Sequence, residues 1–119
     1  MNFELTREFI DNLRMLIDSD DQQQVSELLR ELHAADIAEI MDVLTMEEAR
    51  YIYLSLEGEK ASDVLIEIPE DDRRRFLNAL PPEYIARQFI EHMDSDDAAD
   101  ILGELDEDTK KSVLKEIGD

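Results

Sequence analysis

An apolar stripe that recurs every twelve residues is the feature of this sequence that most constrains its fold. The stripe places apolar side chains at positions i, i+3, i+4 and i+7, which is one face of a short helix. It is complete at residues 25–32, 37–44, 49–56 and 61–68. Helices this short are marginal alone, because nucleation is costly and few hydrogen bonds repay it. Each helix must therefore bury its stripe against neighbouring helices.

The stripe continues beyond residue 68 with two irregularities. Arg73 takes the first slot of the next stripe, ahead of the apolar residues between 76 and 80. One extra residue at the Pro81-Pro82 pair then shifts the frame by one, and the stripe resumes in residues 86–93, 98–105 and 113–117.

Short signals separate these stripes at the places where helices should begin. Thr45 and Glu48 have the spacing of a capping box, in which each side chain binds the backbone amide of the other residue. Pro69, Pro81 and Pro82 fit helix starts, where a missing backbone amide costs nothing. No segment alternates apolar and polar residues between turn signals, as a half-buried strand does. The sequence therefore predicts helices and no strands.

We expect an all-α fold that forms a single domain over residues 1–119. A longer N-terminal helix within residues 1–20 should precede about eight short helices within residues 21–119. Because a twelve-residue repeat leaves almost no linker, consecutive helices must turn sharply and stack, which predicts a compact superhelix. An irregular helical bundle with a coincidental repeat is the alternative.

The net charge of −20 limits the partners that this chain can have. Nucleic acid is excluded as a direct partner, because neutralising phosphates requires Lys and Arg on one face. Cations, a basic protein surface or solvent alone remain. The absence of Cys excludes thiol catalysis, disulfides and a soft-metal site. No signal peptide and no apolar run of about 18 residues is present, so we expect a soluble, cytosolic segment that does not enter a membrane.

Two carboxylates stand out among many acidic residues. Asp96 and Asp100 are four residues apart on a predicted helix that starts after Asp94, so their side chains are neighbours off the apolar stripe. Two such charges about 6 Å apart repel by roughly 1–3 kcal/mol, and a divalent cation would reverse that sign. Carboxylate oxygens are hard ligands suited to Mg²⁺ or Ca²⁺. The alternative is an acidic surface that keeps the protein soluble. Asp94 and Asp97 fit helix capping and the helix dipole better than cation binding.

The remaining polar residues do not form a catalytic constellation. His33 fits helix capping or packing, and no Ser or Cys nucleophile pattern accompanies His92. We therefore expect no enzymatic activity. Residues 73–75 form a cluster of three arginines, which either forms salt bridges within the domain or meets an acidic partner.

Three segments together resemble the cytosolic N-terminal domain of MgtE-type magnesium transporters. They are LRELHAADIAEIMDVLTMEEAR at residues 29–50, ASDVLIEIPEDDRRRFLNALPPE at 61–83 and MDSDDAADILGELDED at 93–108. The resemblance extends from about Val25 to Ile117. It implies a right-handed superhelix of short helices, followed in the family by paired CBS domains, a connecting helix and a membrane pore. None of those later parts is in this sequence, so we expect it to be one domain of a longer chain.

The resemblance also implies a function and a set of site residues. The family's N-terminal domain senses intracellular Mg²⁺, which binds between its acidic face and the CBS domains and stabilises the closed pore. The matching metal ligands are Asp63, Asp96 and Asp100, and Asp97 and Glu104 are additional candidates on the acidic face. The cofactor expected is therefore weakly bound Mg²⁺, shared with domains outside this sequence.

The partners that the resemblance implies are the CBS domain pair and the pore domain of the same chain. The full-length protein should be a homodimer on the cytoplasmic side of the cell membrane, whereas the isolated segment should be monomeric. A superhelical protein-interaction module of the flagellar motor-switch (FliG) type is one alternative function. An acidic domain that binds a basic partner is another, and it would lose binding in monovalent salt without preferring Mg²⁺.

Overall fold

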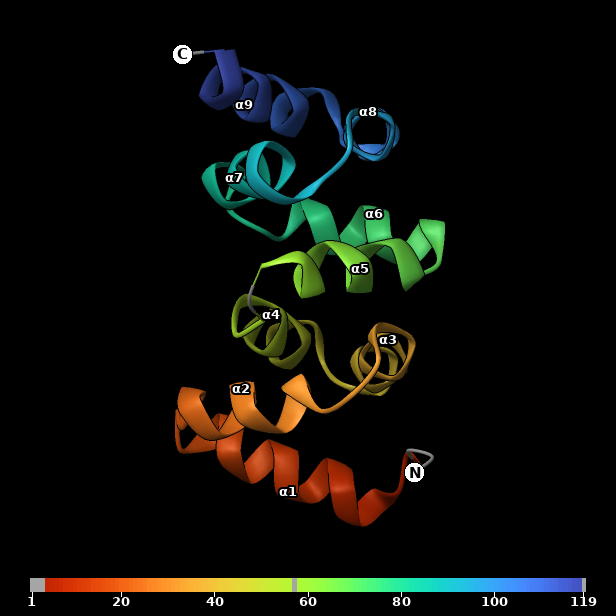
Figure 1. Ribbon diagram of the computed structural model, residues 1–119, viewed down its shortest axis with the longest axis vertical. Coiled ribbons are helices and arrows are strands. Elements are labelled where there is room, and N and C mark those ends of the chain that lie inside the picture. The colour runs from red at the N-terminus through yellow and green to blue at the C-terminus, as the bar shows by residue number, and fades with distance from the viewer. Residues whose placement is uncertain (1–3, 57, 119) are drawn as a thin grey trace. The chain divides into compact units, whose positions relative to one another are not determined.

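Helices joined by short connections make up the computed structural model, which describes residues 4–56 and 58–118 apart from the side chains of residues 89–91 (Figure 1). The helices are α1 (Arg7–Asp18), α2 (Gln22–Arg30), α3 (Ala34–Val43), α4 (Met46–Leu54), α5 (Glu59–Glu67), α6 (Glu70–Asn78), α7 (Pro82–His92), α8 (Ser95–Glu104) and α9 (Glu107–Gly118). No strand occurs in these described ranges. The predicted all-α fold is therefore confirmed, and the superhelical arrangement stays a prediction.

The chain divides into two compact units, Met1–Glu67 and Ile68–Asp119. In the first unit, α1 packs against α2 and α4, and α3 packs against α4 and α5. In the second unit, α7 packs against α9, and an ion pair connects α6 with α8. The single domain predicted over residues 1–119 stays a prediction.

The core of the first unit is built from the repeated apolar stripes. The residues that it buries almost completely come from all five helices, as expected for short helices that cannot be stable alone: Leu13, Val25, Leu29, Ile37, Ile40, Ile52, Tyr53, Ala61, Val64 and Leu65. The twelve-residue spacing thus corresponds to one helix and its connection, with the stripe turned inward.

The second unit follows the same plan. Its buried apolar residues are Ile68, Phe76, Leu77, Leu80, Ile85, Ala86, Ile101, Leu105 and Val113. Leu114 is an exception among the stripe residues, because 46% of its surface is exposed. The predicted stripe side chains of Phe89 and Ile90 lie outside the described residues.

The helix starts follow the predicted capping signals. Thr45 caps α4 with both hydrogen bonds of a capping box: its backbone amide donates to Glu48 Oε1 (2.9 Å), and the Glu48 amide donates to Thr45 Oγ1 (3.1 Å). Pro81 and Pro82 occupy the N-cap and first position of α7. Thr6 caps α1, so this helix begins at Arg7.

Two tyrosines of α4 form hydrogen bonds with other parts of the first unit. The buried Tyr53 hydroxyl donates a hydrogen bond to the Ala61 carbonyl oxygen (3.0 Å). The Tyr51 hydroxyl donates to Asp20 Oδ1 (2.7 Å), and Asp20 lies in the turn after α1 with a φ of 54°. Burial and the neighbouring Asp20 raise the pKa of Tyr51 to about 12, so its hydroxyl keeps its proton.

Candidate metal-binding face

Helix α8 positions the two carboxylates that the sequence singles out. Asp94 is its N-cap residue in extended conformation, and the Ala98 amide donates to the Asp94 carbonyl oxygen (3.0 Å). The capping hydrogen bond expected from a helix amide to the Asp94 side chain is not formed. Ile101 and Leu105 are buried in the second unit, which fixes the direction in which the other faces of α8 point.

Asp96 and Asp100 are both exposed on α8, one helical turn apart. Asp97 beside them is partly buried in the first turn, where its charge complements the helix dipole. The exposed pair supplies hard oxygen donors of the kind that Mg²⁺ prefers. Because Mg²⁺ requires octahedral coordination and retains several waters, two carboxylates are a partial ligand set that fits this ion.

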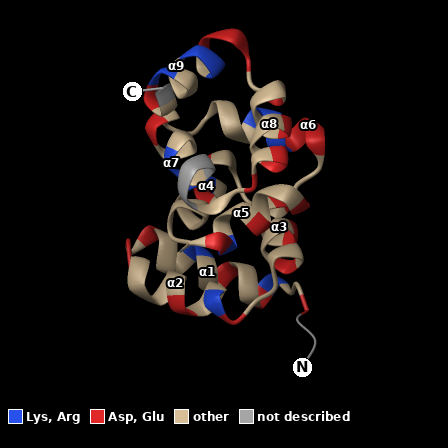
Figure 2. Cartoon of the chain, turned by 45° about the horizontal axis from the view of Figure 1, so that its top comes forward, with Lys and Arg blue, Asp and Glu red and all other residues tan. Residues whose placement is uncertain are grey.

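Asp63 is exposed on α5, between the buried residues Ser62 and Val64. It belongs to the first unit, whereas Asp96 and Asp100 belong to the second. Within the described part of the chain, no three or more His, Cys, Asp or Glu residues are gathered to hold a metal ion. Acidic residues occur on helices of both units (Figure 2). The pair on α8 is therefore the part of the predicted ligand set that the structure brings together.

Glu104 does not extend this exposed acidic face, although the sequence suggested that it would. Only 8% of its surface is exposed, because Arg73 of α6 binds it within the second unit. Arg73 Nε donates to Glu104 Oε2 (2.7 Å), and Arg73 Nη2 donates to Glu104 Oε1 in a second, short hydrogen bond. Arg73 Nη1 also donates to the Ile68 carbonyl oxygen (3.1 Å). This fork-to-carboxylate geometry is the strong form of an ion pair.

Arg73 was present in the sequence pattern as a charged residue in a slot that is otherwise apolar. A residue in that slot points inward, and a buried charge requires a partner. The partner is 31 residues away, at a distance that local periodicity does not identify. The hydrogen bonds with Glu104 hold the pKa of Arg73 above its ordinary value despite its burial, and the charges of Glu70 and Asp100 act in the same direction. Arg73 therefore remains positively charged.

The other arginines of the cluster are more exposed. Arg75 forms an ion pair with Asp72 on the same helix (2.5 Å), and its side chain is 73% exposed. Salt bridging within the domain, one of the two alternatives for this cluster, is therefore confirmed for Arg73 and Arg75. Arg74 lies between them on the exposed side of α6.

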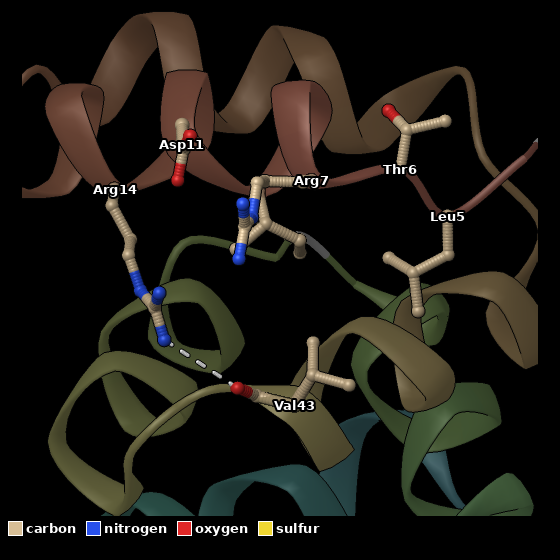
Figure 3. A pocket seen from close by; sticks show the side chains of 7 residues that line it. Leu5, Thr6, Arg7, Asp11, Arg14 and Val43 are labelled. Atoms are coloured by element: carbon tan, nitrogen blue, oxygen red, sulfur yellow. Dashed lines mark hydrogen bonds between the residues drawn. The ribbon is translucent and has the colours of Figure 1, made fainter.

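A cavity of about 340 Å³ lies in the first unit, between the start of α1 and the end of α3. Figure 3 shows Arg7 and Arg14 reaching from α1 toward it. Arg14 donates to the Val43 carbonyl oxygen (3.5 Å) and to Glu48 Oε2 (3.1 Å). Arg7, Asp11 and Arg14 all line this cavity, so it carries charges of both signs, and a single carboxylate is a poor ligand set for a cation.

None of the described helices is both long enough and apolar enough to span a bilayer.

Comparison with known proteins identifies the family of most of the chain. The family described as the MgtE intracellular N domain matches residues 32–119. The match includes α3 to α9 and therefore Asp63, Asp96 and Asp100, whereas α1 and α2 precede it. A search of curated proteins gave no match. Because the match covers most of the chain and agrees with the segments that resembled this family, the chain belongs to the family of MgtE intracellular N domains.

Proposed function

We propose that this chain is the Mg²⁺-sensing regulatory domain of a magnesium transporter. In this proposal, the exposed carboxylates of Asp96 and Asp100 on α8 bind Mg²⁺ jointly with the CBS domains of the same longer chain. The observation that carries the proposal is the exposed pair on one helix face, in a chain that belongs to the MgtE intracellular N domain family.

The electrostatics of the chain support a sensor that works by charge neutralisation. Its net charge of −20 opposes close approach of any second acidic surface. A divalent cation placed between two such surfaces converts repulsion into attraction. When Mg²⁺ is scarce the surfaces separate, and when it is abundant they close. Binding of Mg²⁺ thus stabilises the closed state of the transporter.

A site shared between domains explains why the ligand set on this chain is partial. An ion shifts an equilibrium between two states only if its affinity differs between them. Ligands divided across a mobile interface provide that difference, because the complete set exists only when the interface is closed. Asp63 on α5 is exposed in the first unit and supplies a carboxylate for a separate contact of the same kind with those domains. Mg²⁺ retains part of its hydration, so binding to the isolated domain is weak.

The wider assembly follows from the same proposal. The domain lies on the cytoplasmic side of the cell membrane and acts with the CBS pair and the pore domain of a homodimeric transporter. Alone, it is monomeric and requires no enzymatic activity for its role.

An NMR titration of the 119-residue chain with MgCl₂ at constant ionic strength tests the proposal. We expect saturable shifts centred on the amides of Asp96 and Asp100, absent from a parallel NaCl titration. The double variant Asp96→Asn/Asp100→Asn should lose them. The matched control Glu39→Gln/Asp42→Asn removes the same formal charge from exposed positions on α3 and should retain them.

Two other results would overturn this function. Shifts spread over all acidic residues and reproduced by NaCl would mean that only an acidic surface is being screened. Mg²⁺ shifts that persist in the Asp96→Asn/Asp100→Asn variant would place cation binding elsewhere and leave a protein-interaction module as the better explanation.

A further inference from the structure

The buried ion pair between α6 and α8 lies beside the proposed cation face. Arg73 and Glu104 retain only 16% and 8% of their side-chain exposure. Two hydrogen bonds from the guanidinium hold the Glu104 carboxylate, and a third connects Arg73 to the Ile68 carbonyl oxygen. The orientation of α8 within the second unit is therefore fixed by a charged contact as well as by apolar packing.

This ion pair and the exposed carboxylates are connected through one helix. Glu104 follows Asp100 by four residues, so the two side chains are neighbours along α8. The hydrogen bonds with Glu104, and after them the charges of Glu104, Glu70 and Asp100, raise the pKa of Arg73. The Arg73 charge thus offsets the Glu104 charge one helical turn from Asp100, close to the place where a cation would bind.

We propose that Arg73 is a positioning residue that holds α8 through Glu104 and, by neutralising the Glu104 charge, keeps cation binding at Asp96 and Asp100 weaker than it would be without Arg73. This inference rests on the proposed function, since it concerns the affinity of the same face. A buried ion pair contributes little net stability compared with apolar residues of similar volume. The role of this pair is therefore better tested by its effect on the electrostatic potential around Asp96 and Asp100 than by its effect on stability.

The two members of the pair act on a nearby cation with opposite sign. Arg73 repels Mg²⁺, and Glu104 attracts it, so the intact pair is nearly neutral at a distance. Arg73→Gln should leave an extra negative charge and tighten Mg²⁺ binding. Glu104→Gln should leave an unneutralised positive charge and weaken it. If the pair only maintained the fold, both variants would disturb α8 and both would weaken binding.

The experiment is an NMR titration of the 119-residue chain with MgCl₂ at constant ionic strength. We expect about a two- to fivefold change in Kd in opposite directions, the size expected for one unit charge acting on a divalent cation across roughly 10 Å of well-solvated surface. Arg74→Gln is the matched control, because it removes the same charge from an exposed position one residue along α6. It should change the Kd less than Arg73→Gln does.

Arg73→Gln leaves a buried carboxylate without its partner and can fail to fold. Glu104→Gln then decides the question, because its amide oxygen can still accept a hydrogen bond from Arg73 and the position of α8 can be compared with the wild type in the metal-free NMR spectrum. Weaker Mg²⁺ binding by this variant with unchanged α8 amide shifts in the metal-free spectrum supports the inference, whereas displaced α8 shifts, or unchanged or tighter binding, overturn it. Changes of the same sign in both variants, or an Arg74→Gln effect as large as that of Arg73→Gln, also overturn it.

A second measurement keeps this inference separate from the proposed function. Paramagnetic relaxation of the α8 amides by positively and negatively charged nitroxides reports the local electrostatic potential without any metal. Glu104→Gln should make that potential less negative at Asp96 and Asp100. An unchanged potential overturns the inference even if Mg²⁺ binds. If the wild-type chain does not bind Mg²⁺, but Arg73→Gln makes the potential more negative and Glu104→Gln makes it less negative, the proposed function is refuted and the effect of Arg73 is supported.

Discussion

Replacing Arg73 by methionine should destabilise the second unit strongly, whereas replacing both members of its ion pair should not. Removing one partner from a buried pair costs about 3–5 kcal/mol, because the other charge stays buried without compensation. Arg73 and Glu104 retain 16% and 8% of their side-chain exposure, so some solvent screening remains. We therefore expect Arg73→Met to lower the free energy of unfolding by about 2–4 kcal/mol.

This loss is large for a chain of 119 residues, whose total free energy of unfolding should be roughly 6–18 kcal/mol. The double variant Arg73→Met/Glu104→Leu replaces the pair with apolar side chains of similar size. Such replacements are often neutral or stabilising, so we expect it to lie within about 1 kcal/mol of the wild type.

The assay is urea unfolding followed by far-UV circular dichroism, together with the NMR signals of residues in the second unit. Following individual residues matters because the two units can unfold separately, and a single two-state free energy would then be undefined. Arg14→Met is the matched control, since it breaks a more exposed ion pair. In that pair the Arg14 side chain is 41% exposed and the Glu48 side chain is 19% exposed. That pair should contribute less than about 1 kcal/mol.

The reasoning would be refuted by a single-variant loss below about 1 kcal/mol, which would mean that water already solvates Glu104. It would also be refuted if the double variant were as unstable as Arg73→Met. In that case the methionine and leucine side chains do not fill the space of the pair, and packing rather than charge explains the loss.

Four smaller changes test other parts of the structure. Gly103→Ala should raise the melting temperature and stabilise the chain by about 0.5–1 kcal/mol, because alanine favours a helix more than glycine does. An added Cβ at this position meets nothing within 4 Å, so a lower melting temperature would contradict the prediction. Tyr53→Phe should cost about 1 kcal/mol in urea unfolding, because the Ala61 carbonyl oxygen loses the hydrogen bond from the buried Tyr53 hydroxyl, and an unchanged midpoint would contradict that contact. The hydrogen bonds with Thr45 hold the pKa of Glu48 below its ordinary value of 4.5. The charged Glu48 carboxylate therefore stabilises the fold above pH 4.5, and this stabilisation is lost as the pH falls through the lowered pKa. Thr45→Ala should cost about 1 kcal/mol at neutral pH, because the Glu48 backbone amide loses its cap. Glu48→Gln removes the carboxylate that titrates and should make the acid-induced loss of stability shallower, as measured by thermal unfolding between pH 6 and about 3; an unchanged slope would contradict the lowered pKa.

The helical segments and the faces that they bury were predictable from local sequence patterns. The twelve-residue stripe identified residues such as Ile37, Ile52 and Val64 as core positions, and all three are buried. Capping signals located helix starts at Thr45 and Pro81. These features are local, because helical periodicity and capping involve residues within about four positions of one another.

The exposed carboxylate pair was also predictable from the sequence. Asp96 and Asp100 lie four residues apart and off the apolar stripe, so forming α8 is enough to make them neighbours at the surface. Their role in cation binding rests on the proposed function and not on this geometry alone.

The position of Glu104 and the contact that Arg73 makes depend on tertiary packing. Glu104 was an additional candidate for the acidic face, and the arginine cluster could either form salt bridges within the domain or meet an acidic partner. The two residues are 31 positions apart, so their contact depends on how α6 packs against α8 and not on the period of either helix. Burial without a partner is costly for a charge, so this packing selects the ion pair and removes Glu104 from the surface.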